Sequence, residues 1–163
     1  MKFMDKIQLG NWIKTFIFLV MIIALLHWFI IPVRVNGRSM ENALNNKDIM
    51  LVSKIVTVFK GIDRGDMIVI DVNKKDYSSR VVKRVIGIQG DHIVIKNGVV
   101  FVNGEKIVED YSKGETTGDI DMIVEKDNVF ILGDNRTISK DSRSYGSVSL
   151  KNIKGKVIIK FSL

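Results

Sequence analysis

Apolar residues follow two different patterns in this chain, one near the N-terminus and one over the remainder. Between residues 12 and 31, 17 of 20 positions are apolar, and the exceptions are Lys14, Thr15 and His27. A helix of that length reaches about 30 Å, the thickness of a bilayer's hydrocarbon core. The pattern therefore predicts a transmembrane anchor over 12–31, preceded by a cytoplasmic N-terminal segment over 1–11.

A cleaved secretory leader is the alternative interpretation of this apolar stretch. A leader of that kind ends in a small-x-small cleavage site. The chain instead continues Ile-Ile-Pro-Val-Arg over residues 30–34, which favours an uncleaved anchor. Lys2 and Lys6 precede the span, Lys14 lies near its start, and Arg34 and Arg38 follow it, so the positive-inside rule favours a cytoplasmic N-terminus by a small margin.

From residue 33 onward, short β-branched runs alternate with turn signals, which is typical of an antiparallel β domain. Two Asn-Gly pairs, Asn97-Gly98 and Asn103-Gly104, separate alternating apolar residues and predict tight hairpins. The predicted strand runs are 48–58, 66–72, 80–88, 92–104, 129–132 and 156–161. No long amphipathic helix interrupts them, so the pattern does not favour a parallel sheet of βαβ units. Residues 109–127 are polar, and we expect a surface excursion there. The fold class predicted is mostly β, with an extracytoplasmic domain over 33–163.

Composition and charge narrow the chemistry that the chain can carry. It contains no cysteine and two histidines, which excludes disulfides, thiolate nucleophiles and Cys-ligated metal sites. We expect no metal and no cofactor. The net charge is +7, of which residues 33–163 carry +5. This charge suits an anionic membrane surface or nucleic acid, or is simply a solvated lysine-rich face. No nucleic-acid-binding motif is present, so no nucleic-acid partner is expected.

A serine activated by a neutral lysine is the catalytic arrangement that these residues leave open. Neither histidine suits a Ser-His-Asp triad, because His27 lies in the apolar span and His92 begins a hairpin strand. A lysine base must lose its proton near neutral pH, and burial among apolar side chains lowers its pKa. Lys83 fits best, because strand alternation puts it on one face with Val81 and Val85. The alternative is an edge-strand lysine that deters aggregation.

Four motifs then identify a resemblance. Residues 35–40 read VNGRSM, residues 64–66 RGD, residues 83–91 KRVIGIQGD, and residues 133–143 GDNRTISKDSR. They resemble, in order and spacing, the V-x-G-x-S-M, R-G-D, K-R-V-I-G-x-P-G-D and G-D-N-R-x-x-S-x-D-S-R motifs of type I signal peptidases (the leader peptidase family). The resemblance covers most of the chain after the anchor and is Gram-positive-like. It implies an antiparallel β-sheet catalytic domain behind one N-terminal transmembrane helix.

The resemblance also implies a role for each matching residue. Ser39 would be the nucleophile, Lys83 the general base, and Ser139 the residue that orients Lys83. Asp141 and Arg143 would form a structural ion pair behind the site. The backbone N–H of Ser39 would donate to the oxyanion. Apolar residues at five positions would line shallow pockets for small side chains at the first and third residues before the cut: Val35, Met40, Leu44, Val81 and Val82.

The implied function is a single-pass cell-membrane serine endopeptidase that removes signal peptides from exported preproteins with a Ser-Lys dyad. Its partners would be those signal peptides and membrane lipid. An alternative is an accessory member of the family acting in pilus assembly, with pilins as partners, as a specialised peptidase or a non-catalytic pilin chaperone. Loss of the serine or lysine would favour the chaperone, yet both are present.

Three positions depart from the family's usual residues. Asn42 and Ala43 stand where Pro-Thr is usual, and Gln89 stands where proline is usual. Gly37 stands where some relatives carry a serine that adds an oxyanion donor. The residues at positions 42, 43 and 89 remove no catalytic atom. We expect them to alter the backbone around the substrate groove and hence the choice of substrate.

Overall fold

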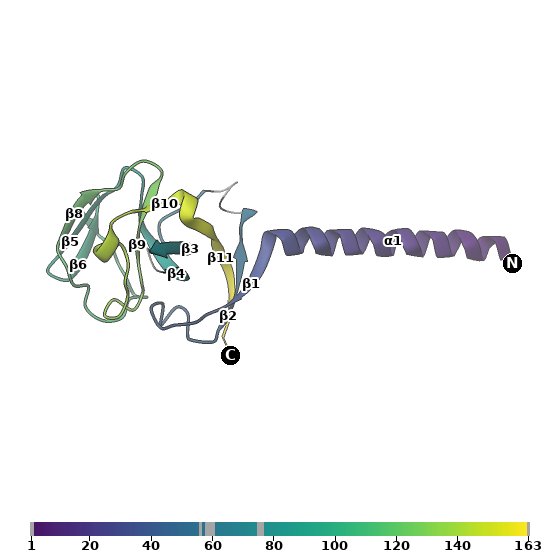
Figure 1. The fold of residues 1–163 in the computed structure, drawn as a ribbon, viewed down its shortest axis with the longest axis horizontal. Helices are drawn as coiled ribbons and strands as arrows, with labels where there is room; N and C mark the ends of the chain where they lie inside the picture. The colour runs from purple at the N-terminus through teal and green to yellow at the C-terminus, as the bar shows by residue number, and fades with distance from the viewer. Residues whose placement is uncertain (1, 56, 58–60, 75–76, 163) are drawn as a thin grey trace. The chain divides into compact units, whose positions relative to one another are not determined.

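The structure, a computed structural model, describes residues 2–55, 57, 61–74 and 77–162. The chain divides into two compact units, residues 1–31 and residues 32–163. The first unit is the helix α1 (Lys2–Phe29), drawn purple in Figure 1. It ends at Phe29 and not at Ile31, because the residue before a proline prefers extended backbone and Pro32 follows. Within the described part of the chain, no helix combines the length and hydropathy that a bilayer crossing requires. The anchor over 12–31 therefore stays a prediction.

The second unit is built from two antiparallel sheets, so the predicted mostly β fold class is confirmed. The larger sheet has the order β1-β2-β11-β3-β4-β9-β10. Its strands are β1 (Ile30–Arg34), β2 (Ile49–Ser53), β3 (Met67–Lys74), β4 (Tyr77–Ile88), β9 (Asn128–Leu132), β10 (Val148–Ser149) and β11 (Ile153–Phe161). Figure 1 shows the smaller sheet at the opposite end of this unit from β2 and β11. Its order is β7-β6-β5-β8, with β5 (His92–Lys96), β6 (Val99–Val102), β7 (Glu105–Lys106) and β8 (Ile120–Ile123).

The two Asn-Gly pairs form the turns that the sequence predicted. Asn97 and Gly98 have φ of 50° and 77° between β5 and β6, and Asn103 and Gly104 have φ of 54° and 84° between β6 and β7. Two consecutive positive φ angles define the type I′ geometry whose twist matches a hairpin. These turns fix the register of the smaller sheet, in which Ile93 pairs with Val102.

Two predicted segments differ from the structure. The run 48–58 continues as a strand only to Ser53, and residues 56 and 58 lie outside the described residues. The excursion 109–127 contains a strand, β8, which pairs with β5. Its four residues alternate between half-buried and exposed, and the half-buried Ile120 and Met122 pack against the core of the smaller sheet. The strand was missed because it is short and follows a polar, glycine-containing stretch.

Strand β9 is buried on both faces and organises the core. Phe130 and Leu132 pack with the side chains of β5 and β6, while Val129 and Ile131 pack with Ile68, Ile70 and other residues of β3 and β4. Alternating side chains on one strand thus serve two apolar clusters. The polar segment 133–143 follows β9 directly and runs into the first turn of the short helix α3 (Ser142–Tyr145), so this buried strand fixes where the segment begins.

Candidate active site

Ser39 lies in the turn-rich segment between β1 and β2. The base of this segment is closed by a hydrogen bond in which the Val35 N–H donates to the Asp48 carbonyl oxygen at 2.8 Å. Gly37 has φ of 121°, a conformation that residues with a side chain rarely adopt. Its N–H donates to Asn46 Oδ1 at 3.1 Å, which holds the glycine in that conformation. These two hydrogen bonds hold the backbone just before Ser39, and the Ser39 residue itself is half-buried.

The segment that follows β9 holds both Ser39 and Ser139. The Asn135 N–H donates to the Ser39 carbonyl oxygen at 3.0 Å, and the Ser139 N–H donates to the Asn135 carbonyl oxygen at 3.1 Å. Gly133 passes between them: a Cβ added there would lie 2.6 Å from the Ser39 carbonyl oxygen and 2.2 Å from Ser139 Oγ. Because Gly133 has no side chain, the Ser39 carbonyl oxygen and the Ser139 side chain can both pack closely against it.

Lys83 lies in the middle of β4, where it pairs with Ile68 of β3. The strand pattern predicted burial here, and only 3% of the residue is exposed. Burial lowers the pKa of Lys83 from 10.5 to about 8, although the nearby carboxylates of Asp141 and Asp134 act in the opposite direction. About a tenth of the amine is therefore neutral at pH 7. An amine in this state can accept a proton from a hydroxyl group near neutral pH.

Ser139 places a hydroxyl group inside the protein. Its Oγ is buried and has no hydrogen-bond partner among the described residues. It lies close enough to Asp141 to help lower the pKa of that carboxyl group. The hydrogen bond from Ser139 to Lys83 that the resemblance implies stays a prediction.

Asp141 and Arg143 form an ion pair behind the two serines. Arg143 Nε donates to Asp141 Oδ1 at 2.8 Å and a terminal nitrogen donates to Oδ2 at 3.0 Å. Asp141 has no exposed surface, and the Gly133 N–H donates to its Oδ2 at 3.0 Å. Burial alone would raise the pKa of Asp141, but the bonds from Arg143 and Gly133 outweigh it and hold the pKa below 3.8. Arg143 also donates to the Ser139 carbonyl oxygen at 3.2 Å, which secures the segment.

A groove of about 220 Å³ opens beside Ser39. It is lined by Val33, Arg34, Val35, Asn36, Gly37, Ser39, Met40, Met50, Val69, Arg80, Val81 and Val82. Four of the five predicted pocket residues thus line it, and Leu44 differs. Leu44 has no exposed surface and packs in the apolar cluster with Val35 and Met40. The turn in which the Leu44 N–H donates to the Met40 carbonyl oxygen at 2.7 Å directs it inward, so Leu44 supports the groove wall from beneath.

The polar excursion packs against the segment 133–143, which the sequence did not predict. Arg84 bonds both oxygens of Asp134, at 2.8 Å and 2.6 Å, and its guanidinium lies 4.0 Å from the centre of the Tyr111 ring. Arg136, which is 1% exposed, pairs with Glu109. Acidic and aromatic residues of the excursion therefore neutralise and cover the arginines of the motif segments. No local signal in the sequence indicates contacts over such separations.

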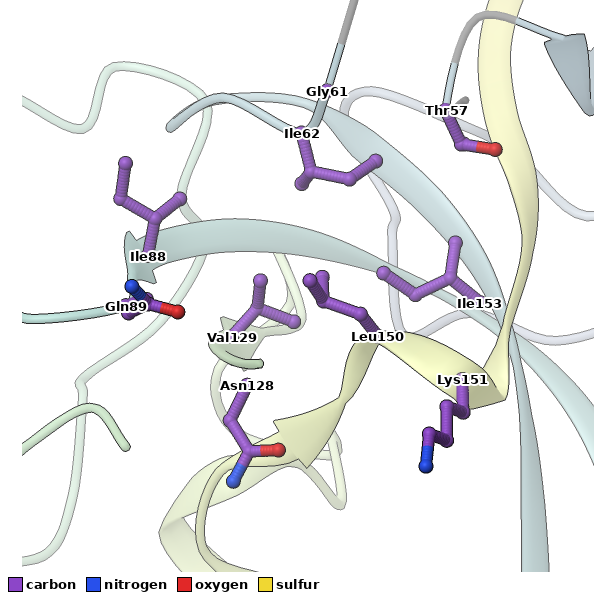
Figure 2. A pocket seen from close by; sticks show the side chains of 10 residues that line it. All are labelled: Thr57, Gly61, Ile62, Ile88, Gln89, Asn128, Val129, Leu150, Lys151 and Ile153. Atoms are coloured by element: carbon purple, nitrogen blue, oxygen red, sulfur yellow. The ribbon is translucent and has the colours of Figure 1, made fainter. Parts of the chain in front are cut away.

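A second cavity, of about 640 Å³, lies away from these residues (Figure 2). Ile62, Leu150 and Ile153 point into a common apolar space there, and Lys151 extends away from it. Gln89 lines this cavity and accepts a hydrogen bond from the Asp127 N–H at 2.9 Å. Gln89 does not line the groove beside Ser39, and its expected effect on the backbone around that groove stays a prediction. The described residues contain no group of three or more His, Cys, Asp or Glu side chains that could hold a metal ion.

Comparisons with known proteins agree with this fold and with the motifs. The family described as "Signal peptidase, peptidase S26" matches residues 9–162. Signal peptidase I of Bacillus caldolyticus is 39% identical over 78% of this chain and 76% of its own length. Signal peptidase I P of Bacillus subtilis subsp. natto is 36% identical over 92% of this chain and 87% of its own. Signal peptidase IB of Staphylococcus aureus is 32% identical over 96% and 91%.

A solved structure matches the same fold. The signal peptidase I from Enterococcus faecalis V583 aligns with a TM-score of 0.52 and 27% sequence identity. It covers 60% of this chain and 97% of its own length. The protein is thus a peptidase of the serine class. It belongs to the signal peptidase family, peptidase S26, with relatives in Gram-positive bacteria.

Proposed function

We propose that this protein removes signal peptides from exported preproteins, with Ser39 as nucleophile and Lys83 as general base. The observation that carries the proposal is the state of Lys83, an amine that is 3% exposed and has a pKa of about 8. Its strand neighbours Val81 and Val82 line the same groove as Ser39. Burial of a charged lysine costs free energy, and strongly perturbed pKa values are typical of catalytic groups, which supports a catalytic role for Lys83.

The reaction follows from these groups. Neutral Lys83 takes the proton of Ser39 Oγ as that oxygen attacks the peptide carbonyl carbon, and the Ser39 backbone N–H stabilises the oxyanion. The tetrahedral intermediate collapses, the C–N bond breaks, and protonated Lys83 gives its proton to the leaving amine. Lys83 then accepts a proton from water as the water attacks the Ser39 ester. The bond between Ser39 Oγ and the acyl carbon then breaks as protonated Lys83 returns its proton to Ser39 Oγ, which releases the signal peptide with a new C-terminal carboxylate.

Ser139 and the ion pair behind it complete the proposed machinery. The buried, unpartnered Ser139 Oγ would hydrogen-bond the Lys83 amine and direct its lone pair toward Ser39. Asp141 and Arg143 would hold the Ser139 backbone through the bond from Arg143 to the Ser139 carbonyl oxygen. Gly37 offers no side-chain donor to the oxyanion, so the backbone donor would act without that help.

Small side chains at the first and third residues before the cut would suit the groove. Its apolar wall contains Val35, Met40, Val81 and Val82, and its volume of about 220 Å³ admits short side chains. Long or charged side chains placed against this apolar wall would lose hydration.

The anchor and topology are also part of the proposal. Apolar side chains of α1 between Trp12 and Ile23 are exposed on the helix, including Phe16 at 66% and Met21 at 58%, which suits an apolar surrounding. Ser39 follows residue 31 by eight residues, at most about 28 Å of extended chain. The nucleophile would therefore act close to the bilayer in which a preprotein's apolar segment lies. The N-terminus would lie in the cytoplasm and the catalytic unit outside the cell membrane. The net charge of +5 on the catalytic unit would favour binding to anionic lipids.

Reconstitution tests the proposal. The full-length protein in lipid vesicles should cleave a preprotein after its signal peptide, and N-terminal sequencing of the product should identify the cut. A Ser39→Ala protein prepared in the same way is the control. Binding of a pilin without cleavage of any substrate would contradict the proposal and favour the chaperone alternative. Cleavage confined to pilins would favour the specialised peptidase. For topology, protease added to intact spheroplasts should digest the catalytic unit, and its protection would reverse the orientation.

A further inference from the structure

Glu41, two residues after Ser39, joins three segments that are distant in sequence. Its Oε1 accepts a hydrogen bond from Arg38 at 3.1 Å. Its Oε2 accepts one from Asn135 Nδ2 at 3.0 Å and lies 3.3 Å from Lys113 Nζ. The Glu41 side chain is 22% exposed, so these contacts are made at a partly covered position. One carboxylate thus links the segment of the nucleophile, the segment 133–143 and the polar excursion.

The contact with Asn135 reaches the nucleophile directly. Asn135 donates its backbone N–H to the Ser39 carbonyl oxygen and accepts the Ser139 N–H at its own carbonyl. Asn135 also forms a bridge with Lys113, the other partner of Glu41 Oε2. Asn135 therefore links the backbones of Ser39 and Ser139 through its own backbone hydrogen bonds. Glu41 in turn holds the position of the Asn135 side chain.

The backbone after Glu41 explains why such a link is needed here. Asn42 has φ of 95°, whereas proline fixes φ near −65°. The proline that is usual at this position in the family resemblance cannot occupy the conformation that this chain adopts. Proline stiffens a loop covalently, but this loop is held by side chains from elsewhere. Besides Glu41, Lys160 Nζ donates to the Ala43 carbonyl oxygen at 2.8 Å.

We propose that Glu41 is a positioning residue, which holds Ser39 in register with Ser139 through Asn135 and replaces the rigidity of a proline at position 42. This inference rests on the proposed function, because register between the two serines matters only if they act together. Glu41 touches neither the reacting atoms nor the groove. Displacing a nucleophile by about 1 Å can cost a factor of about 100 in rate, so a remote link of this kind is enough to control activity.

Kinetics of three variants test the proposal. Glu41→Ala should lower kcat about ten- to a hundredfold while KM changes less than about threefold, since the groove is intact. Glu41→Gln keeps an oxygen for Asn135 and should retain kcat within about threefold of the wild type. Asp66→Ala is the matched control. Asp66 also pairs with a lysine, Lys156, at 2.6 Å, accepts a backbone N–H at 2.9 Å, and lines neither cavity. It should leave kcat unchanged even if it lowers thermal stability.

A double-mutant cycle separates positioning from a general loss of stability. Asn135→Ala removes the amide that Glu41 binds but keeps the backbone N–H to Ser39. If Glu41 acts through Asn135, the double variant Glu41→Ala, Asn135→Ala should be no slower than the slower single variant. Losses that multiply independently would contradict the proposed route.

Amide hydrogen exchange gives a readout that does not depend on activity. In Glu41→Ala, exchange of the Asn135 N–H should accelerate at least about tenfold, and Asp66→Ala should leave it unchanged. If the wild type cleaves no preprotein, the proposed function fails, and the exchange measurement still decides the positioning role. If the wild type cleaves and Glu41→Ala keeps both full kcat and a protected Asn135 amide, the positioning role alone is overturned.

Discussion

Gly133 and Ser139 approach so closely that a single methyl group at Gly133 would lie 2.2 Å from Ser139 Oγ. The same added carbon would lie 2.6 Å from the Ser39 carbonyl oxygen. The added carbon would also lie 2.5 Å from Ser139 Cβ, so rotation of the Ser139 hydroxyl group would not relieve the clash, and the backbones of both serines are hydrogen-bonded to Asn135. The two serines of the proposed site are therefore packed around a glycine, and their relative position depends on the absence of a side chain there.

Gly133→Ala should consequently reduce activity by displacing Ser39 and Ser139 relative to each other, in addition to destabilising the fold. We expect a loss of about 1 to 3 kcal/mol of unfolding free energy from overpacking and a fall of kcat in the folded fraction. Gly155→Ala is the control, because an added Cβ there would lie 2.6 Å from Val52 and 2.8 Å from the Ser53 carbonyl oxygen. That variant should lose comparable stability and keep its kcat. Equal kcat in both variants would contradict the packing of the serines around Gly133.

Lys83→Met should stabilise the protein while abolishing cleavage. Burial lowers the pKa of Lys83 to about 8 from 10.5, so the charged form is penalised in the folded state. Below pH 8 both folded and unfolded forms are protonated, and the penalty of about 3 kcal/mol is fully present. Between pH 8 and 10.5 the unfolded state binds more protons, so wild-type stability rises with pH. Chemical unfolding should therefore show that the advantage of Lys83→Met is largest at pH 7 and shrinks toward pH 10.5. An advantage independent of pH would contradict the burial of a titrating amine.

Asp141→Ala should be strongly destabilising because it leaves Arg143 nearly buried without its partner. A buried pair broken on one side costs about 3 to 5 kcal/mol. Asp71→Ala breaks a more exposed pair, with Arg80, and should cost much less. The pKa of Asp141 is lowered, so its stabilisation is present above pH 3.8 and is lost as the pH falls through the folded pKa. Urea unfolding at pH 7 and at acidic pH checks both statements, and equal losses in the two variants would refute them.

Asn42→Pro should damage the segment that carries Ser39, although proline is the usual residue at this position in the family. The φ of 95° at Asn42 is inaccessible to proline and open to glycine. We expect Asn42→Gly to keep near wild-type cleavage and Asn42→Pro to lose activity and about 1 to 3 kcal/mol of stability. Wild-type stability in thermal melts and wild-type cleavage by Asn42→Pro would contradict the positive φ angle at position 42.

Local patterns in the sequence predicted the parts of the fold that depend on near neighbours. The Asn-Gly pairs specified the two hairpins, and alternation around Lys83 indicated its burial. Four short motifs also indicated the family. The sequence did not predict β8, because a strand of four residues is too short for its side-chain alternation to be distinguished from a loop.

Contacts between distant segments could not be predicted in the same way. Glu41 and Asn135 are 94 positions apart, and Lys160 and Ala43 are 117 positions apart. Such pairs depend on how the sheets bring segments together, and no local spacing encodes that arrangement. The family resemblance implied that Leu44 lines the groove, and an apolar residue at that position suits a core as well as a pocket; in the structure it is buried with Val35 and Met40.

The Ser39–Lys83 dyad is the central claim, and one comparison tests it most directly. Full-length wild type, Ser39→Ala and Lys83→Arg should be reconstituted in identical lipid vesicles, and the rate of preprotein cleavage measured for each. Arginine keeps the positive charge but does not lose its proton in proteins, so it cannot act as a base. The account predicts cleavage by the wild type alone, with all three proteins folded by circular dichroism. Cleavage by folded Lys83→Arg or folded Ser39→Ala at near the wild-type rate would contradict it.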